Sequence, residues 1–230
     1  MTAGGHSWAY DGFGNRTTGL LVDAATNRIS TGGYTYDANG NLTAMPFFLT
    51  GLTYDVENRM TQATHTLNGT EQYGYSPDNK RIWKKKPDGS EEIYFYGVDR
   101  RKLGSYQPSY PPSYPQFTLI SKNVYFAGKL IQSQGGAVMV DRLGSVRVGA
   151  PGGSTNSRYY EYGEEQSATP NDREKFGTYF RDGTTALDYA DQRYYASTLG
   201  RFLTPDPYRP VQWRAFWEVG TATCMWRTTL

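Results

Sequence analysis

The chain has 230 residues and a formal net charge of +2, with acidic and basic residues interspersed. No apolar run approaches the ~18–20 residues of a membrane span, and the one cysteine, Cys224, excludes an internal disulfide and a Cys-based zinc site. The two histidines, His6 and His65, lie far apart, so we expect no metal site and no cofactor. The most basic segment, 80–86, predicts a solvated strand face and no nucleic-acid partner, because nucleic-acid binding needs a clustered basic patch.

Tyrosine and glycine dominate the composition, with 20 and 26 copies. Tyrosine favours strands and buries a ring while its hydroxyl stays hydrated. Glycine favours turns. The composition therefore predicts an all-β fold of short strands and tight turns.

A Tyr-Asp repeat runs through the first part of the chain. It occurs at 8–16, 34–42 and 52–60, with a diverged copy at 73–81. The residues that define it are Tyr10, Asp11, Tyr36, Asp37, Gly40, Tyr54, Asp55 and Tyr75. Internal repeats of this kind indicate one supersecondary unit used several times.

The copy at 34–42 shows what the unit forms. Tyr34 and Tyr36 lie on the same face of a strand, because side chains alternate along it. Asp37 can accept backbone N–H bonds in the turn, and Gly40 suits a left-handed backbone position. The unit predicts a β-hairpin with a loop of about three to five residues. A lone hairpin is marginal in water, so we expect the hairpins to join edge to edge into an open, coiled sheet.

A segment rich in proline and tyrosine, 105–117, follows the repeats at 1–104. Proline blocks ladder hydrogen bonds and favours an extended polyproline conformation. We therefore expect an exposed loop between strands.

From residue 118 to 207 the sequence carries an ordered set of motifs. They stand at 141–147, 159–164, 174–182, 185–195 and 200–207. Their key residues are Asp141, Gly144, Tyr160, Gly163, Asp188, Tyr189, Arg193, Tyr194, Tyr195, Gly200, Arg201, Phe202, Pro205, Asp206 and Pro207. With the Tyr-Asp repeats, this set resembles the YD-repeat proteins of the rearrangement-hotspot (Rhs) type and their repeat-associated core. One departure is Glu161, where the family usually has proline.

The resemblance implies a role as well as a fold. YD repeats in this family coil into a hollow shell, the core plugs its C-terminal end, and a variable toxin domain that follows the core is held inside. The teneurins of animals carry a similar shell. The expected partners are therefore further YD repeats of a longer chain and a toxin domain. The expected location is secreted or cell-surface, although the chain shows no signal peptide.

Several family members cleave themselves after the core, using two aspartates that share a proton. Asp206 matches the first of these aspartates, and Arg201 is a candidate charge partner. No aspartate follows Asp206 in this chain. We therefore expect neither self-cleavage nor another enzymatic activity.

The tail, 208–230, lacks the expected family motif, and we expect it to be disordered. Residues 219–230 can be back-translated so that a frame shifted by one base reads Ser-Trp-Asn-Arg-Tyr-Met-Tyr-Val-Glu-Asp-Asp-Pro. Our hypothesis is a frameshift after Pro207 that truncates the core. Two alternatives to a structural shell fragment remain open at this stage. One is a carbohydrate or cell-surface binding module, and the other is a non-functional, truncated reading frame.

Overall fold

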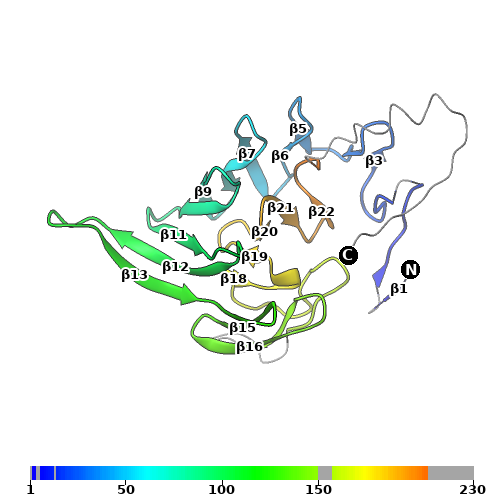
Figure 1. Ribbon diagram of the computed structural model, residues 1–230. Coiled ribbons are helices and arrows are strands. Elements are labelled where there is room, and N and C mark those ends of the chain that lie inside the picture. The colour runs from blue at the N-terminus through cyan, green and yellow to red at the C-terminus, as the bar shows by residue number, and fades with distance from the viewer. Residues whose placement is uncertain (1, 4–5, 13, 150–156, 207–230) are drawn as a thin grey trace, which may run out of the picture.

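The computed structural model describes residues 2–3, 6–12, 14–149 and 157–206 (Figure 1). In this part of the chain the strands form several antiparallel sheets, none closed, and no α-helix occurs. The predicted all-β class of hairpins in open sheets is confirmed. No helix in these ranges is long and apolar enough to span a membrane. Pro207 and the tail 208–230 lie outside the described residues, and so do the expectations about them.

The largest sheet has seven strands, each paired antiparallel with its neighbour in sequence. Its strands are β7 (Leu49–Tyr54), β8 (Met60–His65), β9 (Gly69–Tyr75), β10 (Arg81–Lys85), β11 (Glu91–Tyr96), β12 (Lys102–Ser109) and β13 (Gln116–Lys122). Consecutive pairing of this kind is what edge-to-edge hairpins predict.

Smaller sheets flank this one in the sequence. Before it come the two-stranded pairs β1 (Thr2–Ala3) with β2 (His6–Ser7), β3 (Val22–Asp23) with β4 (Arg28–Ile29), and β5 (Thr35–Tyr36) with β6 (Leu42–Ala44). After it come β14 (Val124–Phe126), β15 (Lys129–Ser133), β16 (Gly136–Val140) and β17 (Val146–Gly149) in one sheet. The last sheet contains β18 (Arg173–Glu174), β19 (Phe180–Arg181), β20 (Asp188–Ala190), β21 (Arg193–Ala196) and β22 (Arg201–Phe202), with a 3₁₀ turn at Phe176–Thr178.

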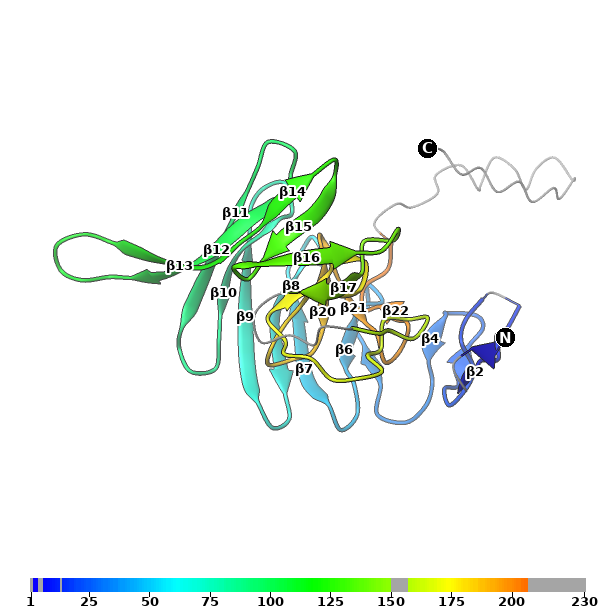
Figure 2. The same cartoon turned by 90° about the horizontal axis from the view of Figure 1, so that it is seen from below.

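The hairpins from β5 to β17 form an arc, and the sheet β18–β22 lies on its concave side (Figures 1 and 2). We call the residues from 172 to 206, which include this sheet, the inner segment. One apolar core joins the two layers. The arc contributes Leu42, Leu49, Leu52, Met60, Ala63 and Tyr73, and the inner segment contributes Phe180, Leu187, Tyr189, Tyr194, Leu199 and Leu203. The inner segment is the last part of the described chain, so its residues contact residues of the arc that lie more than a hundred positions earlier in the sequence.

One turn recurs along the chain. In the copy that begins at Asp37, the N–H of Asp37 donates to Asn41 O at 3.0 Å and Gly40 N–H donates to Asp37 O at 3.1 Å. The Asp37 carboxylate accepts the N–H of Asn41 at 2.9 Å, and Gly40 has φ 89°. The same backbone pattern begins at residues 11, 37, 55, 76, 86, 97, 141 and 160, each with positive φ at its fourth residue. This is the three-residue hairpin loop with a left-handed bulge residue, so the predicted role of Gly40 is confirmed.

The repeat tyrosines link each hairpin to the one before it. The hydroxyl of Tyr54 donates to Leu42 O at 2.7 Å, and that of Tyr75 donates to Met60 O at 2.6 Å. Tyr96, which the repeat pattern did not include, donates in the same way to Arg81 O at 2.8 Å. The three rings therefore lie on the inner side of the arc, and each hydroxyl is hydrogen-bonded to a main-chain carbonyl.

The expected loop at 105–117 is shorter than the sequence indicated. Residues 105–109 belong to β12 and 116–117 to β13, and the two strands form a hairpin that projects from the arc (Figures 1 and 2). Most of the prolines, at 111, 112 and 115, lie between the strands, where no ladder bond is lost. Tyr110 and Tyr114 are exposed there.

Replacing Tyr75 with phenylalanine tests the link between hairpins. Tyr75→Phe keeps the ring and removes the bond to Met60 O, so the free energy of unfolding should fall by about 1 kcal/mol. Tyr110→Phe is the matched control, because Tyr110 is 66% exposed and its loss of a hydroxyl should change nothing measurable. Urea unfolding of both variants checks the difference. Equal stabilities would contradict the link.

Candidate functional site

The basic segment 80–86 is not a solvated face, and that prediction is wrong. Arg81 and Lys84 are buried on the inner side of β10, whereas Ile82 between them is 38% exposed. The pairing with β9 shifts register between Arg81 and Trp83. A bulge re-aims side chains, so two cations three residues apart can both point inward.

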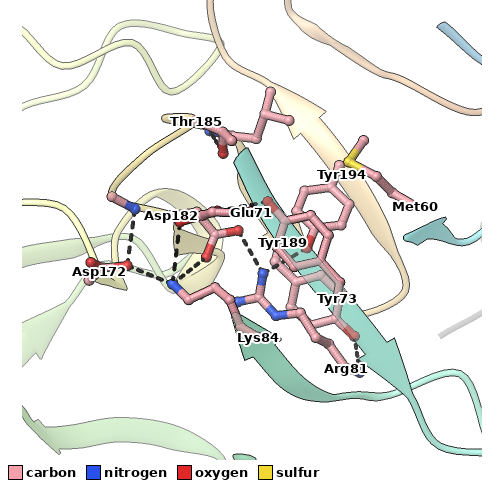
Figure 3. A network of polar contacts seen from close by, with 12 residues as sticks. Met60, Glu71, Tyr73, Arg81, Lys84, Asp172, Asp182, Thr185, Tyr189 and Tyr194 are labelled. Carbon is pink, nitrogen blue, oxygen red and sulfur yellow. Dashed lines mark hydrogen bonds and ion pairs between the residues drawn. The ribbon is translucent and has the colours of Figure 1, made fainter. Parts of the chain in front are cut away.

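Four carboxylates surround these two cations, and we call the set Glu71, Arg81, Lys84, Glu92, Asp172 and Asp182 the buried charged cluster. Figure 3 shows its centre. Arg81 Nη1 donates to Asp182 Oδ2 at 2.6 Å, and Lys84 Nζ lies 3.1 Å from Asp182 Oδ1 and 2.8 Å from Asp172 Oδ1. Glu71, Arg81, Lys84 and Glu92 stand on the arc, and Asp172 and Asp182 belong to the inner segment. The cluster therefore fastens one layer to the other.

Arg81 also sits among aromatic rings from both layers. Its guanidinium carbon lies 4.5 Å from the ring centroid of Tyr189 and 4.9 Å from that of Tyr94. The rings of Tyr73, Phe180 and Tyr194 lie within 5.8 Å. Arg81 Nη1 further donates to the Tyr194 hydroxyl at 2.7 Å, and its backbone N–H donates to the Tyr189 hydroxyl at 2.8 Å. Cation–π attraction strengthens when the cation is desolvated, as here.

Glu71 is the carboxylate with the weakest support. Its Oε1 is buried without a hydrogen-bond partner and lies 3.9 Å from Lys84 Nζ, while its Oε2 accepts the Tyr73 hydroxyl at 2.7 Å. Burial and the nearby charge of Asp182 raise the pKa of the Glu71 carboxyl above its ordinary value, against the opposing effect of Lys84. Glu71 is thus the group in the cluster that favours a proton.

Asp172 shows the opposite behaviour. Burial opposes its charge, but Lys84 and Lys86 outweigh burial and lower the pKa of Asp172 to about 2. The same lysines lower the pKa of Glu92, again against burial. The cluster therefore holds these two acids ionised.

Two further ionic contacts support the inner segment. Glu174 bonds Lys102 at 2.5 Å, Asn123 at 2.8 Å and Ser133 at 2.8 Å, so it ties β18 to the arc, including β15. Asp188, fully buried, accepts Arg181 Nε at 2.8 Å and Arg181 Nη2 at 2.7 Å. Paired, hydrogen-bonded burial is the condition under which interior charges are tolerated.

The motif residues at 141–163 are turn residues. Asp141 caps its turn by accepting Ser145 N–H at 3.0 Å, and Gly144 has φ 87°. Tyr160 opens the next turn, in which Gly163 has φ 88°. A Cβ at Gly163 would lie 2.7 Å from the Phe176 ring, so only glycine fits there.

The motif residues after 188 sit in the inner sheet. Tyr189 and Tyr194 contact Arg81, and the Tyr195 hydroxyl donates to Tyr162 O at 3.0 Å. A Cβ at Gly200 would lie 2.9 Å from the Tyr162 ring. The Arg193 guanidinium covers the Phe202 ring at 3.9 Å, and Pro205 lies against Gly40.

Asp206 lies 3.7 Å from Arg193 Nη2, and its side chain is 61% exposed. Arg201 bonds Asn15 Oδ1 at 2.7 Å and Asn27 O at 3.1 Å. Arg201 therefore links the inner sheet to the N-terminal hairpins. Whether it also serves as the partner of Asp206 in chemistry stays a prediction. Groups of His, Cys, Asp and Glu suited to a metal ion are absent from the described ranges.

Sequence reasoning missed the buried charged cluster. A signal existed in the spacing: Glu71 and Glu92 each stand two residues before a tyrosine, and the Glu92 side chain accepts the Tyr94 hydroxyl at 2.7 Å. Residues two apart on a strand share a face. A carboxylate on the tyrosine-bearing face predicts a buried cation opposite.

The comparisons with known proteins agree with this fold. No protein-family model matches the chain, and no curated protein matches it. Among solved structures, TcdB2-TccC3 without its hypervariable C-terminal region matches 90% of the chain with a TM-score of 0.63 and 19% identity. The Tc holotoxin pore of Photorhabdus luminescens matches 90% with a TM-score of 0.61 and 17% identity. In both cases the match spans 12% of the other chain.

By fold, this chain is therefore similar to a part of the chains in these two Tc toxin structures. These matches support an Rhs-like fold at low sequence identity. At such identity the likeness concerns the fold alone.

Removing the charge of Asp182 should be strongly destabilising. Asp182→Asn leaves Arg81 and Lys84 buried without their shared partner, and breaking a buried pair in this way costs about 3–5 kcal/mol. Asp99→Asn is the matched control. It removes the same charge from an ion pair with Arg101 in which the Asp99 and Arg101 side chains are 50% and 42% exposed, so it should cost roughly 0–1 kcal/mol. Urea unfolding of both variants provides the measurement, and equal costs would show that the cluster does not fasten the layers.

The pH dependence of the free energy of unfolding should reveal the raised pKa of Glu71. A raised pKa in the folded state means that folding takes up a proton. The stability that the folded state gains by holding this proton is fully present at low pH, below the ordinary pKa of 4.5, and is lost as pH rises through the raised pKa. Glu71→Gln removes this loss, so its stability relative to wild type should increase from pH 4.5 to pH 8. A difference that is constant with pH, or that falls, would refute the assignment.

Proposed function

We propose that the chain is a structural β-scaffold, a piece of the wall of a YD-repeat shell with its repeat-associated core docked on the inside. The observation that carries this is the buried charged cluster between the arc and the inner segment, in which only Asp172 is partly exposed. Lys84, Glu71 and Asp182 are 0% exposed in their side chains, so no substrate meets them. Such a cluster fixes one segment against another and supports a structural role.

The wider role follows from the family resemblance and from the toxin-complex neighbours. A wall segment of this fold would belong to a larger secreted or surface-associated protein that encloses a C-terminal toxin domain. The open edges of the arc suit continuation by further hairpins, since unpaired strand edges in a monomer invite aggregation. Further YD repeats of a longer chain are the proposed partners at these edges.

Glycan binding receives no support from the placement of the repeat tyrosines. Sugar recognition by tyrosine uses an open ring face and a free hydroxyl. The hydroxyls of Tyr54, Tyr75 and Tyr96 are bonded to backbone carbonyls, and cations cover the rings of Tyr75 and Tyr96 at 5.3 and 5.5 Å. The scaffold role explains these rings without a ligand.

Expression of this chain together with the coding DNA on both sides of it tests whether a shell encloses the polypeptide that follows the core. If the chain is shell wall, YD repeats should precede it, and the polypeptide that follows the core should resist trypsin until the shell is unfolded. The control is the same downstream polypeptide expressed alone, which should be digested at once. Equal digestion in the two contexts would remove the enclosure proposal, as would flanking DNA that encodes no YD repeats.

We also propose that the chain does not cleave itself. Asp206 is the one aspartate that matches the family site. Its carboxylate is 61% exposed and lies 3.7 Å from Arg193 Nη2, and the sequence printed after it holds no further aspartate. The purified chain and its Asp206→Asn variant should both run as one full-length species after days of incubation, as intact-mass spectrometry would show. A shortened product present only in the wild type would establish aspartyl cleavage.

A further inference from the structure

A cleft of about 690 Å³ opens between the arc and the inner segment, and neither the fold nor the buried charged cluster uses it. Its walls come from turns that are distant in sequence: 96–102 after β11, 127–130 between β14 and β15, and 140–144 between β16 and β17. The inner segment closes it with 177–180 and 189–191. Its size lies within the range of about 300–1,000 Å³ that ligand sites occupy.

The acids of the cleft are already committed to partners. Asp191 pairs with Lys80, Asp99 with Arg101 at 3.3 Å, and Glu174 with Lys102. Asp141 is held by Arg147 at 2.9 Å and by the N–H groups of its own turn. The negative charge in the cleft is therefore neutralised internally.

Two cations of the cleft are left over. Lys129 is the first residue of β15 and Arg142 lies in the turn after β16; both side chains are exposed and form no hydrogen bond or ion pair with another described residue. Arg100 adds a half-exposed guanidinium on the turn after β11, with Asp78 3.5 Å away. Because positive groups without partners line separate walls, the field in the cleft favours an anion that extends across it.

The aromatic residues of the cleft restrict the class of anion. The hydroxyls of Tyr96, Tyr125 and Tyr189 donate to backbone carbonyls, and the rings of Tyr96 and Tyr125 lie under Lys80 and Arg101. These three hydroxyls are therefore not free to donate to sugar oxygens, and the ring of Tyr179, which also lines the cleft, packs edge to face with Phe176 and Tyr195. A chain with several carboxylates can pair with cations on separate walls of the cleft, and apolar Leu143, 66% exposed at the rim, suits a peptide.

We infer that this cleft binds an extended acidic peptide segment, with Lys129 and Arg142 as its specificity-determining cations. The inference deepens the proposed scaffold function, because it names the kind of polypeptide that the inner side of the wall would hold. The two can fail separately: loss of peptide binding would leave the fold and the buried charged cluster unchanged, and loss of enclosure would leave the cleft intact.

Fluorescence anisotropy with fluorescein-labelled octaglutamate tests the inference on the purified chain. Wild type should bind the probe, with an affinity that weakens as salt is added. The Lys129→Glu/Arg142→Glu variant should lose roughly tenfold or more in affinity, because like charges then face the ligand. The matched control is Lys122→Glu/Arg158→Glu, which makes the same charge change at exposed residues outside the cleft and should bind like wild type. All four side chains are exposed, and equal thermal unfolding of the three proteins would establish that folding is unaffected.

Three outcomes would overturn the inference. The first is no binding of octaglutamate by wild type, and the second is an equal loss in both double variants, which would show general charge attraction. The third is a hyaluronan hexasaccharide that displaces the probe and binds more tightly through the same two residues, since the cleft would then belong to an acidic saccharide.

Discussion

The guanidinium of Arg81 is the point at which the two layers of the protein meet. It bonds Asp182 and Tyr194 of the inner segment while it lies against Tyr73 and Tyr94 of the arc. An unpaired cation at this depth would be prohibitively costly. The inner segment must therefore dock for the arc to bury this strand, and the arc must be present for Asp182 to be buried at all.

This mutual requirement explains why the layers differ in composition. The arc supplies cations and rings in repeated hairpins, and the inner segment supplies Asp172, Asp182 and further tyrosines in short strands joined by irregular loops. Apolar contacts such as those of Leu42 and Met60 with the inner segment add non-directional stability. The directional contacts decide which register of the inner segment is accepted.

The repeats could be predicted from sequence because their determinants are local. Asp37, Gly40 and Tyr36 fix a turn, a bulge residue and a ring within five residues. The turns at 86–90 and 97–101 escaped prediction because they begin with lysine and glycine in place of aspartate, although their backbone bonds are the same. The repeat is thus a property of the backbone that several side chains satisfy.

The buried charged cluster could not be predicted in this way. Its members lie about a hundred residues apart, and the exposed appearance of 80–86 follows from charge content alone. The bulge at Arg81, which turns two cations inward, leaves no mark in the hydrophobic pattern. Prediction from one chain failed where a local irregularity and a distant partner together decide burial.

The tyrosine that joins each hairpin to its predecessor has a consequence for how such a row of hairpins can change in evolution. Its hydroxyl needs only a main-chain oxygen, as Leu42, Met60 and Arg81 show, and every amino acid provides one. Duplication or deletion of a whole hairpin would present the next tyrosine with an equivalent acceptor, so the arc could lengthen or shorten by whole hairpins. The strand that carries Arg81 is the exception, since its side chain bonds Asp182 and Tyr194, and the inner segment would remain attached to that one hairpin whatever the number of others.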